Sequence, residues 1–109
     1  MVTTRDQALE IAAKVRIELE KIYGERLRGV YLYGSAARDQ LTAESDIDVA
    51  VILDHIPNRS HEHEWTSQLG ADISLEYGTV VLFFFAEQEE LEEGRFPIHE
   101  VIKQEGIRL

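Results

Sequence analysis

Two aspartates stand one residue apart at the start of an apolar segment, and this spacing suits the binding of a cation. Asp46 and Asp48 flank Ile47, and the segment continues through residues 49–53 without a polar side chain. In a strand both carboxylates would point to one face, about 7 Å apart. A carboxylate beside a hydrophobic core is costly unless a cation compensates its charge. Oxygen ligands of this kind suit Mg²⁺, which keeps water or substrate phosphate in its remaining positions.

A glycine and a serine close the preceding apolar segment, residues 27–33. Gly34 allows a close backbone approach, and the N–H groups that follow Ser35 favour an anion. Arg38, one turn further on, could reach the same anion. Ten residues separate Ser35 from Asp46, too few for a comfortable helical crossover between parallel strands. We therefore expect antiparallel strands that bring the Gly-Ser turn beside the aspartates, an arrangement that indicates phosphoryl or nucleotidyl transfer.

The segment GSAARDQLTAESDID resembles the Gly-Ser, ten residues, Asp-x-Asp signature of the DNA polymerase β-type nucleotidyltransferase superfamily. Within it, this 109-residue chain resembles the minimal nucleotidyltransferases. The likeness covers roughly residues 5–55, and the C-terminal FPIHEVIKQEGIRL is also similar to the tail of single-domain members. The resemblance implies an α/β (α+β) nucleotidyltransferase fold, with a small mixed β-sheet flanked by helices in a single domain over residues 1–109.

The same resemblance assigns roles to the motif residues. Gly34 and Ser35 would hold the triphosphate of ATP or another nucleotide, and Asp46 and Asp48 would be catalytic and bind Mg²⁺. An acceptor hydroxyl would attack the α-phosphate and release pyrophosphate.

The acceptor that the resemblance implies is a protein. Many small members pair with a helical HEPN-type toxin, a ribonuclease, and act as its antitoxin by transferring AMP to a tyrosine. We expect that activity here. One alternative is a weakly active or inactive binding module that neutralises its partner by contact, and another is a catalytic subunit for a small-molecule acceptor such as an aminoglycoside.

The sequence departs from the family pattern at two places. Asp39 stands where many members have glycine, and we expect it to face solvent. The third catalytic carboxylate of the family usually lies on a later strand, but TVVLFFF, residues 79–85, contains no acid. If DISLEY is a strand, Asp72 is the candidate and Glu76 the weaker one. In a helix both are surface acids, which we favour, and the missing acid would then leave nucleotide binding intact but turnover in doubt.

The hydrophobic pattern predicts the elements that position these residues. Apolar residues at three- and four-residue spacing indicate helices, and β-branched or aromatic runs indicate strands. Thr4 and Gln7 are typical of a capping box at a helix start, and Gly24 is a plausible stop. The expected helices are 4–23, a segment near 65–77, an acidic helix within 86–94 and another within 96–106; the expected strands are 27–33, 46–53 and 79–85, with a loop at 54–64.

Several aromatic and histidine side chains have a simpler explanation than chemistry. His61 and His63 form a lone His-x-His in a polar segment, which is more typical of solvated side chains than of a zinc site. Trp65, Tyr77 and the phenylalanines at 83–85 are expected in the core. A phenylalanine face left exposed would instead serve a homo-oligomer or partner surface.

Composition narrows the classes of partner. The chain has 21 acidic and 11 basic residues, a net charge of −10, which argues against direct binding to nucleic acid. A phosphate-bearing ligand therefore needs a metal ion or local donors. No run of about 18 apolar residues and no secretory signal pattern occur, so we expect no membrane segment. The absence of cysteine fits a cytoplasmic protein.

Overall fold

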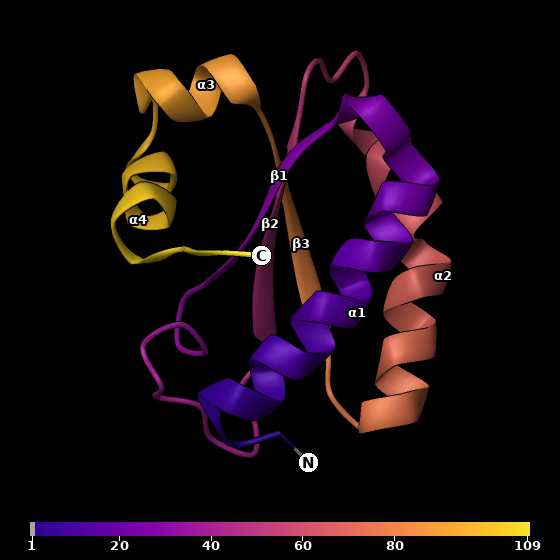
Figure 1. Ribbon diagram of the computed structural model, residues 1–109, viewed down its shortest axis with the longest axis vertical. Coiled ribbons are helices and arrows are strands. Elements are labelled where there is room, and N and C mark those ends of the chain that lie inside the picture. Colours follow the sequence, from indigo (N-terminus) through magenta and orange to yellow (C-terminus); the bar gives the residue numbers. More distant parts are fainter. Residues whose placement is uncertain (1) are drawn as a thin grey trace.

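A mixed four-stranded sheet separates two pairs of helices in the computed structural model, which describes residues 2–109 (Figure 1). Helices α1 and α2 cover one face, and α3 and α4 cover the other. This architecture confirms the expected fold class. In chain order the elements are α1 (Arg5–Tyr23), a 3₁₀ turn (Gly24–Arg26), β1 (Leu27–Tyr33), β2 (Ile47–Leu53), α2 (Arg59–Tyr77), β3 (Val81–Glu87), α3 (Gln88–Glu93), α4 (Pro97–Glu105) and β4 (Ile107–Arg108).

The strand order is β3-β2-β1-β4, and the register places the sequence motif at one end of the sheet. β1 and β2 are antiparallel, as expected, with Tyr33 opposite Asp48. β3 runs parallel to β2, with Leu82 opposite Asp48. The short β4 pairs antiparallel with β1. The end of β1 therefore meets the start of β2 at one sheet end, where the Gly-Ser turn and the Asp-x-Asp segment lie.

Side chains of β2 alternate between two apolar cores. One core lies under α1 and α2, and the other lies under α3 and α4. Ile47 and Val49 belong to the first core, whereas Ala50 and Ile52 belong to the second. Because side chains in a strand alternate faces, Asp48 points to the α3 and α4 side.

The start of helix α2 corrects the expected loop at residues 54–64. The helix begins at Arg59, and the Asn58 side chain caps it by accepting a hydrogen bond from the Ser60 N–H at 3.0 Å. The first two turns of α2 are mostly exposed and polar, so they carry no apolar periodicity. Trp65 corrects a second expectation: its side chain is 53% exposed rather than in the core, and it stacks on the ring of His61.

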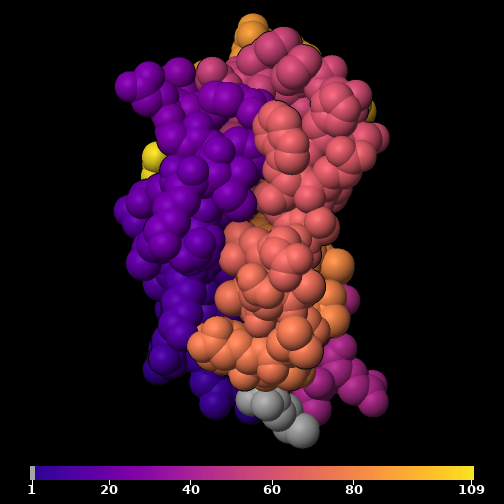
Figure 2. All heavy atoms as spheres, turned by 90° about the vertical axis from the view of Figure 1, so that its right-hand side faces the viewer, coloured from indigo at the N-terminus to yellow at the C-terminus, as the bar shows by residue number. Residues whose placement is uncertain are grey.

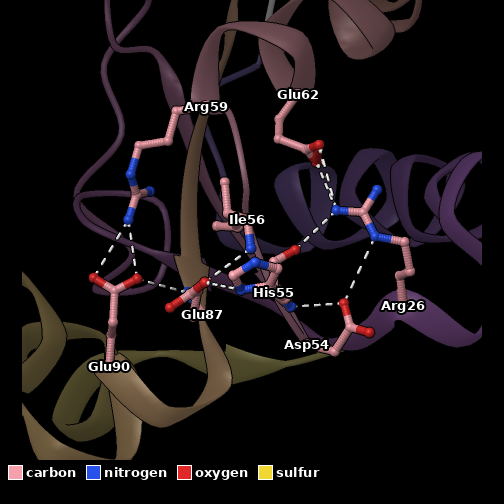
Figure 3. Close-up of polar contacts among 8 residues, drawn as sticks. All are labelled: Arg26, Asp54, His55, Ile56, Arg59, Glu62, Glu87 and Glu90. Atoms are coloured by element: carbon pink, nitrogen blue, oxygen red, sulfur yellow. Dashed lines mark hydrogen bonds and ion pairs between the residues drawn. The ribbon is translucent and has the colours of Figure 1, made fainter.

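A polar network fixes the end of the sheet remote from the Gly-Ser turn (Figure 3). The carboxylate of Glu62 on α2 is buried, and both its oxygens lie 3.4 Å from Arg26 Nη2. Arg26 also donates to the His55 carbonyl at 2.9 Å and pairs with Asp54. Arg26 thereby joins the start of β1, the end of β2 and the first turn of α2. Glu62 stands in a polar part of the sequence that predicts exposed side chains. Its buried carboxylate nevertheless attaches the start of α2 to the sheet through Arg26.

Strand β3 forms one edge of the sheet, since only β2 pairs with it among the described strands. Val80, which immediately precedes the strand, and Leu82, its second residue, are 48% and 47% exposed. No helix within residues 2–109 has the length and apolar character needed to cross a membrane.

Candidate active site

Gly34 brings the end of β1 into contact with the second aspartate of the pair. Its φ of +72° lies in the left-handed region that favours glycine. A Cβ at this position would collide with Asp48 Oδ2. The glycine therefore serves two purposes, because it permits the turn and leaves room for the carboxylate. The structure thus brings together the two halves of the sequence motif.

The electrostatics of the aspartate pair favour a cation. Burial raises the pKa of the Asp48 carboxyl, the charge of Asp46 raises it further, and the Arg38 guanidinium lowers it. Asp46 itself is exposed and immediately precedes β2. A divalent cation between the carboxylates would remove their repulsion, so the residues fit Mg²⁺. Within residues 2–109 no three His, Cys, Asp or Glu side chains converge as a metal site, so the remaining ligands would be water or phosphate.

The turn after Gly34 contains backbone N–H groups without a hydrogen-bond acceptor among the described residues. Arg38 N–H bonds to the Gly34 carbonyl at 3.3 Å, and Gln40 N–H bonds to the Ser35 carbonyl at 2.8 Å. Ala36 and Ala37 lie between Arg38 and Ser35, and their N–H groups donate to no described residue although both residues are buried. Successive free N–H groups in a turn form a concavity that suits phosphate oxygens. We call residues 34–40 the phosphate turn.

Arg38 is held at the edge of the phosphate turn by a residue that sequence reasoning missed. Its Nη1 lies 2.8 Å from Glu105 Oε2 at the end of α4, and its Nε donates to Gln40 Oε1 at 3.1 Å. Glu44 and Asp39 are closer to Arg38 in the sequence, but neither side chain binds it. No local signal identified Glu105, since it lies 67 positions after Arg38 in the sequence.

Asp39, at the position where the sequence departs from the expected family pattern, has a structural role. Its φ is +58°, the only positive value at a non-glycine residue within residues 2–109. Its Oδ1 accepts a hydrogen bond from the Arg5 N–H at 2.9 Å, at the first turn of α1. The side chain is exposed, as expected, but it also caps that helix. The positive φ is a conformation that favours glycine, and the hydrogen bond with the Arg5 N–H gives the aspartate a role at this position.

The structure does not bring Asp72 to the aspartate pair. Residues 72–77 are helical, so the strand on which this assignment depended is absent. Asp72 accepts a hydrogen bond from Gln68 at 2.8 Å and lines a groove of about 660 Å³ between α1 and α2. Figure 2 shows this face, with α1 and α2 side by side. Asp48 points to the opposite side of the sheet.

The β3 position beside Asp48 belongs to Leu82. The two residues are register partners, and Leu82 is 47% exposed. Among the side chains of β3, only Glu87 is acidic, and it lies opposite Leu53 at the far end of β2. The site therefore contains two carboxylates, and an apolar side chain stands where a third would meet them.

Tyr33 is a further neighbour that sequence reasoning missed. It is the register partner of Asp48 on β1 and is half-buried. Burial, together with the charge of Asp48, raises the pKa of Tyr33 to about 12. The phenol therefore keeps its proton at neutral pH and borders the aspartate pair without adding charge. The antiparallel register was the signal that could have identified it.

Comparisons with known proteins identify the family of this chain. The family model "Polymerase beta, Nucleotidyltransferase" matches residues 10–95. A protein of Methanocaldococcus jannaschii named as a protein adenylyltransferase is 31% identical over 90 residues, covering 81% of this chain and 83% of the relative.

Solved structures share the fold. A crystal structure described as a nucleotidyltransferase from Sulfolobus solfataricus superposes with a TM-score of 0.67 at 19% identity, over 95% of this chain and 80% of that one. A toxin–antitoxin crystal structure with AMP-PNP gives a TM-score of 0.63 at 19% identity, over 87% of this chain and 69% of that one. Together with the motif geometry, the family match shows that this chain belongs to the polymerase beta nucleotidyltransferase family.

Proposed function

We propose that this chain is a Mg²⁺-dependent adenylyltransferase that moves AMP from ATP to a hydroxyl group of a protein, and that it acts as the antitoxin of a HEPN-type toxin. The contact of Gly34 with Asp48 carries the proposal, since it joins the phosphate turn to the aspartate pair. The protein acceptor is supported by the name of the adenylyltransferase relative and by the fold shared with a toxin–antitoxin structure.

In this proposal each part of the site has one task. Ser35 and the free N–H groups of the phosphate turn bind the triphosphate, and the Arg38 guanidinium donates hydrogen bonds to its negatively charged oxygens. Asp46 and Asp48 would hold Mg²⁺, which when bound neutralises phosphate charge. The acceptor oxygen forms a bond to the α-phosphorus, the bond from that phosphorus to the bridging oxygen breaks, and pyrophosphate leaves with the electron pair. The hydroxyl proton passes to solvent or to a base on the acceptor.

A labelling experiment tests this function. The protein would be incubated with Mg²⁺, a HEPN-type helical protein as the acceptor and ATP labelled at the α-phosphate. We expect label on the partner, none with ATP labelled at the γ-phosphate, and loss of label with Asp46→Asn or Asp48→Asn. Glu44→Gln removes an exposed acid of the same loop and should leave labelling intact. Asp72→Asn should also label normally, because Asp72 lies on the other side of the sheet. Labelling that survives both site variants would refute the assignment.

Leu82 supports a second candidate function. With two carboxylates in place of three, the chain could bind a nucleotide and silence its partner by contact alone. A stable complex that carries no label, and whose toxin is inactive, would favour this function over transfer.

A further inference from the structure

The carboxylate of Glu105 forms an ion pair with the guanidinium of Arg38, which belongs to the phosphate turn. The ion pair is short, 2.8 Å between Arg38 Nη1 and Glu105 Oε2, but the two side chains are 42% and 36% exposed. Water therefore reaches both partners, and a pair of this kind contributes little to stability. An anion with several charges can replace one carboxylate there at small cost.

The fold places Glu105 at this position through the segment that follows it. Glu105 is the last residue of α4, and the N–H of Gly106 bonds to the Ile102 carbonyl at 2.8 Å. The chain then becomes β4, in which Ile107 pairs with Leu32 of β1. Because β1 leads directly into the phosphate turn, β4 fixes the end of α4 beside that turn.

We propose that Glu105 is an internal competitor of the nucleotide: without ligand it neutralises Arg38, and the phosphates of ATP displace it. This inference rests on the proposed function, because it assigns the phosphate turn to a triphosphate. Three carboxylates lie near the turn, those of Asp46, Asp48 and Glu105. The guanidinium of Arg38 is the positive charge that acts on Asp48, and it also pairs with Glu105. The competition would select ligands with several negative charges, since these form the strongest charge-assisted hydrogen bonds with the guanidinium of Arg38.

The proposal makes Glu105 a positioning residue, and removing its charge should strengthen binding. Glu105→Gln keeps the shape of the side chain but loses the charge. The dissociation constants of Mg²⁺–ATP and of inorganic tripolyphosphate should then fall by about 3- to 10-fold, as expected for one like charge removed from a partly solvated site. The affinity for adenosine should not change, because adenosine carries no phosphate.

A double-mutant cycle tests whether the effect passes through Arg38. Binding of the same ligands would be measured by calorimetry for wild type, Glu105→Gln, Arg38→Gln and the double variant. Arg38→Gln alone should weaken tripolyphosphate binding, and Glu105→Gln should add nothing in its presence. Glu100→Gln is the matched control, because Glu100 is on the same helix and pairs with Lys103. Melting temperatures would confirm that every variant is folded.

The outcomes separate this inference from the proposed function. Unchanged or weaker tripolyphosphate binding in folded Glu105→Gln overturns the competition while leaving the function standing. Equal tightening in the presence of Arg38→Gln, or in Glu100→Gln, also overturns it, because the effect would then be one of general charge. Failure of the wild-type protein to bind ATP or tripolyphosphate overturns both.

Discussion

At the scale of single residues, Gly34 combines a backbone requirement with a contact requirement, and the two can be separated. Gly34→Ala places a side chain at positive φ and against Asp48 Oδ2. Gly78→Ala has similar backbone strain, at a φ of +64°, but no atom lies within 4 Å of the new Cβ. The pair of variants therefore distinguishes strain from collision.

We predict that Gly34→Ala abolishes Mg²⁺–ATP binding and lowers the free energy of unfolding by about 1–3 kcal/mol. Gly78→Ala should cost about 1–2 kcal/mol and leave binding unchanged. Chemical denaturation and calorimetry measure the two quantities. Normal ATP affinity in Gly34→Ala would mean that Asp48 is not part of the binding site.

Asp48 gives a second prediction, on the pH dependence of stability. Its pKa is raised in the fold, so over the range above its ordinary pKa the native state holds more protons than the unfolded chain. The stability contribution of Asp48 is then complete below the unfolded pKa and is lost as the pH rises through the folded pKa. Asp48→Asn should therefore raise the melting temperature by a few degrees at about pH 7 and by less at about pH 3.5.

Two comparisons check that prediction. Mg²⁺ should stabilise the wild-type protein and have no effect on Asp48→Asn, because the cation favours the ionised pair. Glu44→Gln, an exposed acid of the same loop, should not change the pH profile. A lower melting temperature for Asp48→Asn at neutral pH would contradict the electrostatic account.

The sequence alone predicted that the aspartate pair and the Gly-Ser turn lie side by side, because a local spacing encodes this arrangement. Glu105 and Leu82 could not be found in this way. The first reaches Arg38 from the far end of the chain, and the second lies beside Asp48 only through the register of β3. Residues joined by tertiary contacts alone leave no periodic trace in the sequence.

At the scale of elements, local signals predicted helix ends well where caps are specific. The structure contains the Thr4–Gln7 capping box at the start of α1. Glycine also ends α1, α3 and α4, at Gly24, Gly94 and Gly106. The start of α2 and the strand β4 were missed. The polar first turns of α2 gave no apolar signal, and β4 has two residues, too few for any pattern.

The Arg26–Glu62 pair yields a prediction for α2. The side chain of Glu62 is 2% exposed, so Arg26→Met would leave a buried charge without its partner. The variant also loses the guanidinium that lies over the rings of Tyr23 and Trp65. We expect the free energy of unfolding to fall by about 2–4 kcal/mol.

Adding Glu62→Leu to Arg26→Met should recover part of that loss, because it removes the uncompensated charge. Lys14→Met is the comparison, since Lys14 and Glu76 form an exposed pair that should be worth less than about 1 kcal/mol. Urea denaturation of the four proteins measures these differences. A double variant less stable than Arg26→Met would show that Glu62 has other essential contacts.

At the scale of the whole molecule, the net negative charge and the exposed edge of strand β3 have opposite effects on association between copies of the protein. The Arg59 side chain donates to the Phe85 carbonyl and covers one end of β3. Residues 79–86, TVVLFFFA, carry no charge that would discourage pairing with another strand. The net charge of −10 discourages such pairing instead, because copies of the protein repel one another.

We predict that Val80→Lys slows heat-induced aggregation, because it places a charge at the exposed start of the edge. Light scattering during a slow temperature ramp is the measurement. Leu75→Lys, at an 87% exposed position on α2, is the control and should aggregate as the wild type does. Equal protection by both variants would show that the effect does not depend on the edge of β3.

The uncovered edge of β3 has a consequence for the protein in solution. Repulsion between copies acts over a screening length of about 30 Å at 0.01 M salt and about 8 Å at physiological ionic strength. Copies that remain dispersed in dilute buffer can therefore approach edge to edge as salt is added. The colloidal stability of this molecule is then set as much by its counterions as by its fold.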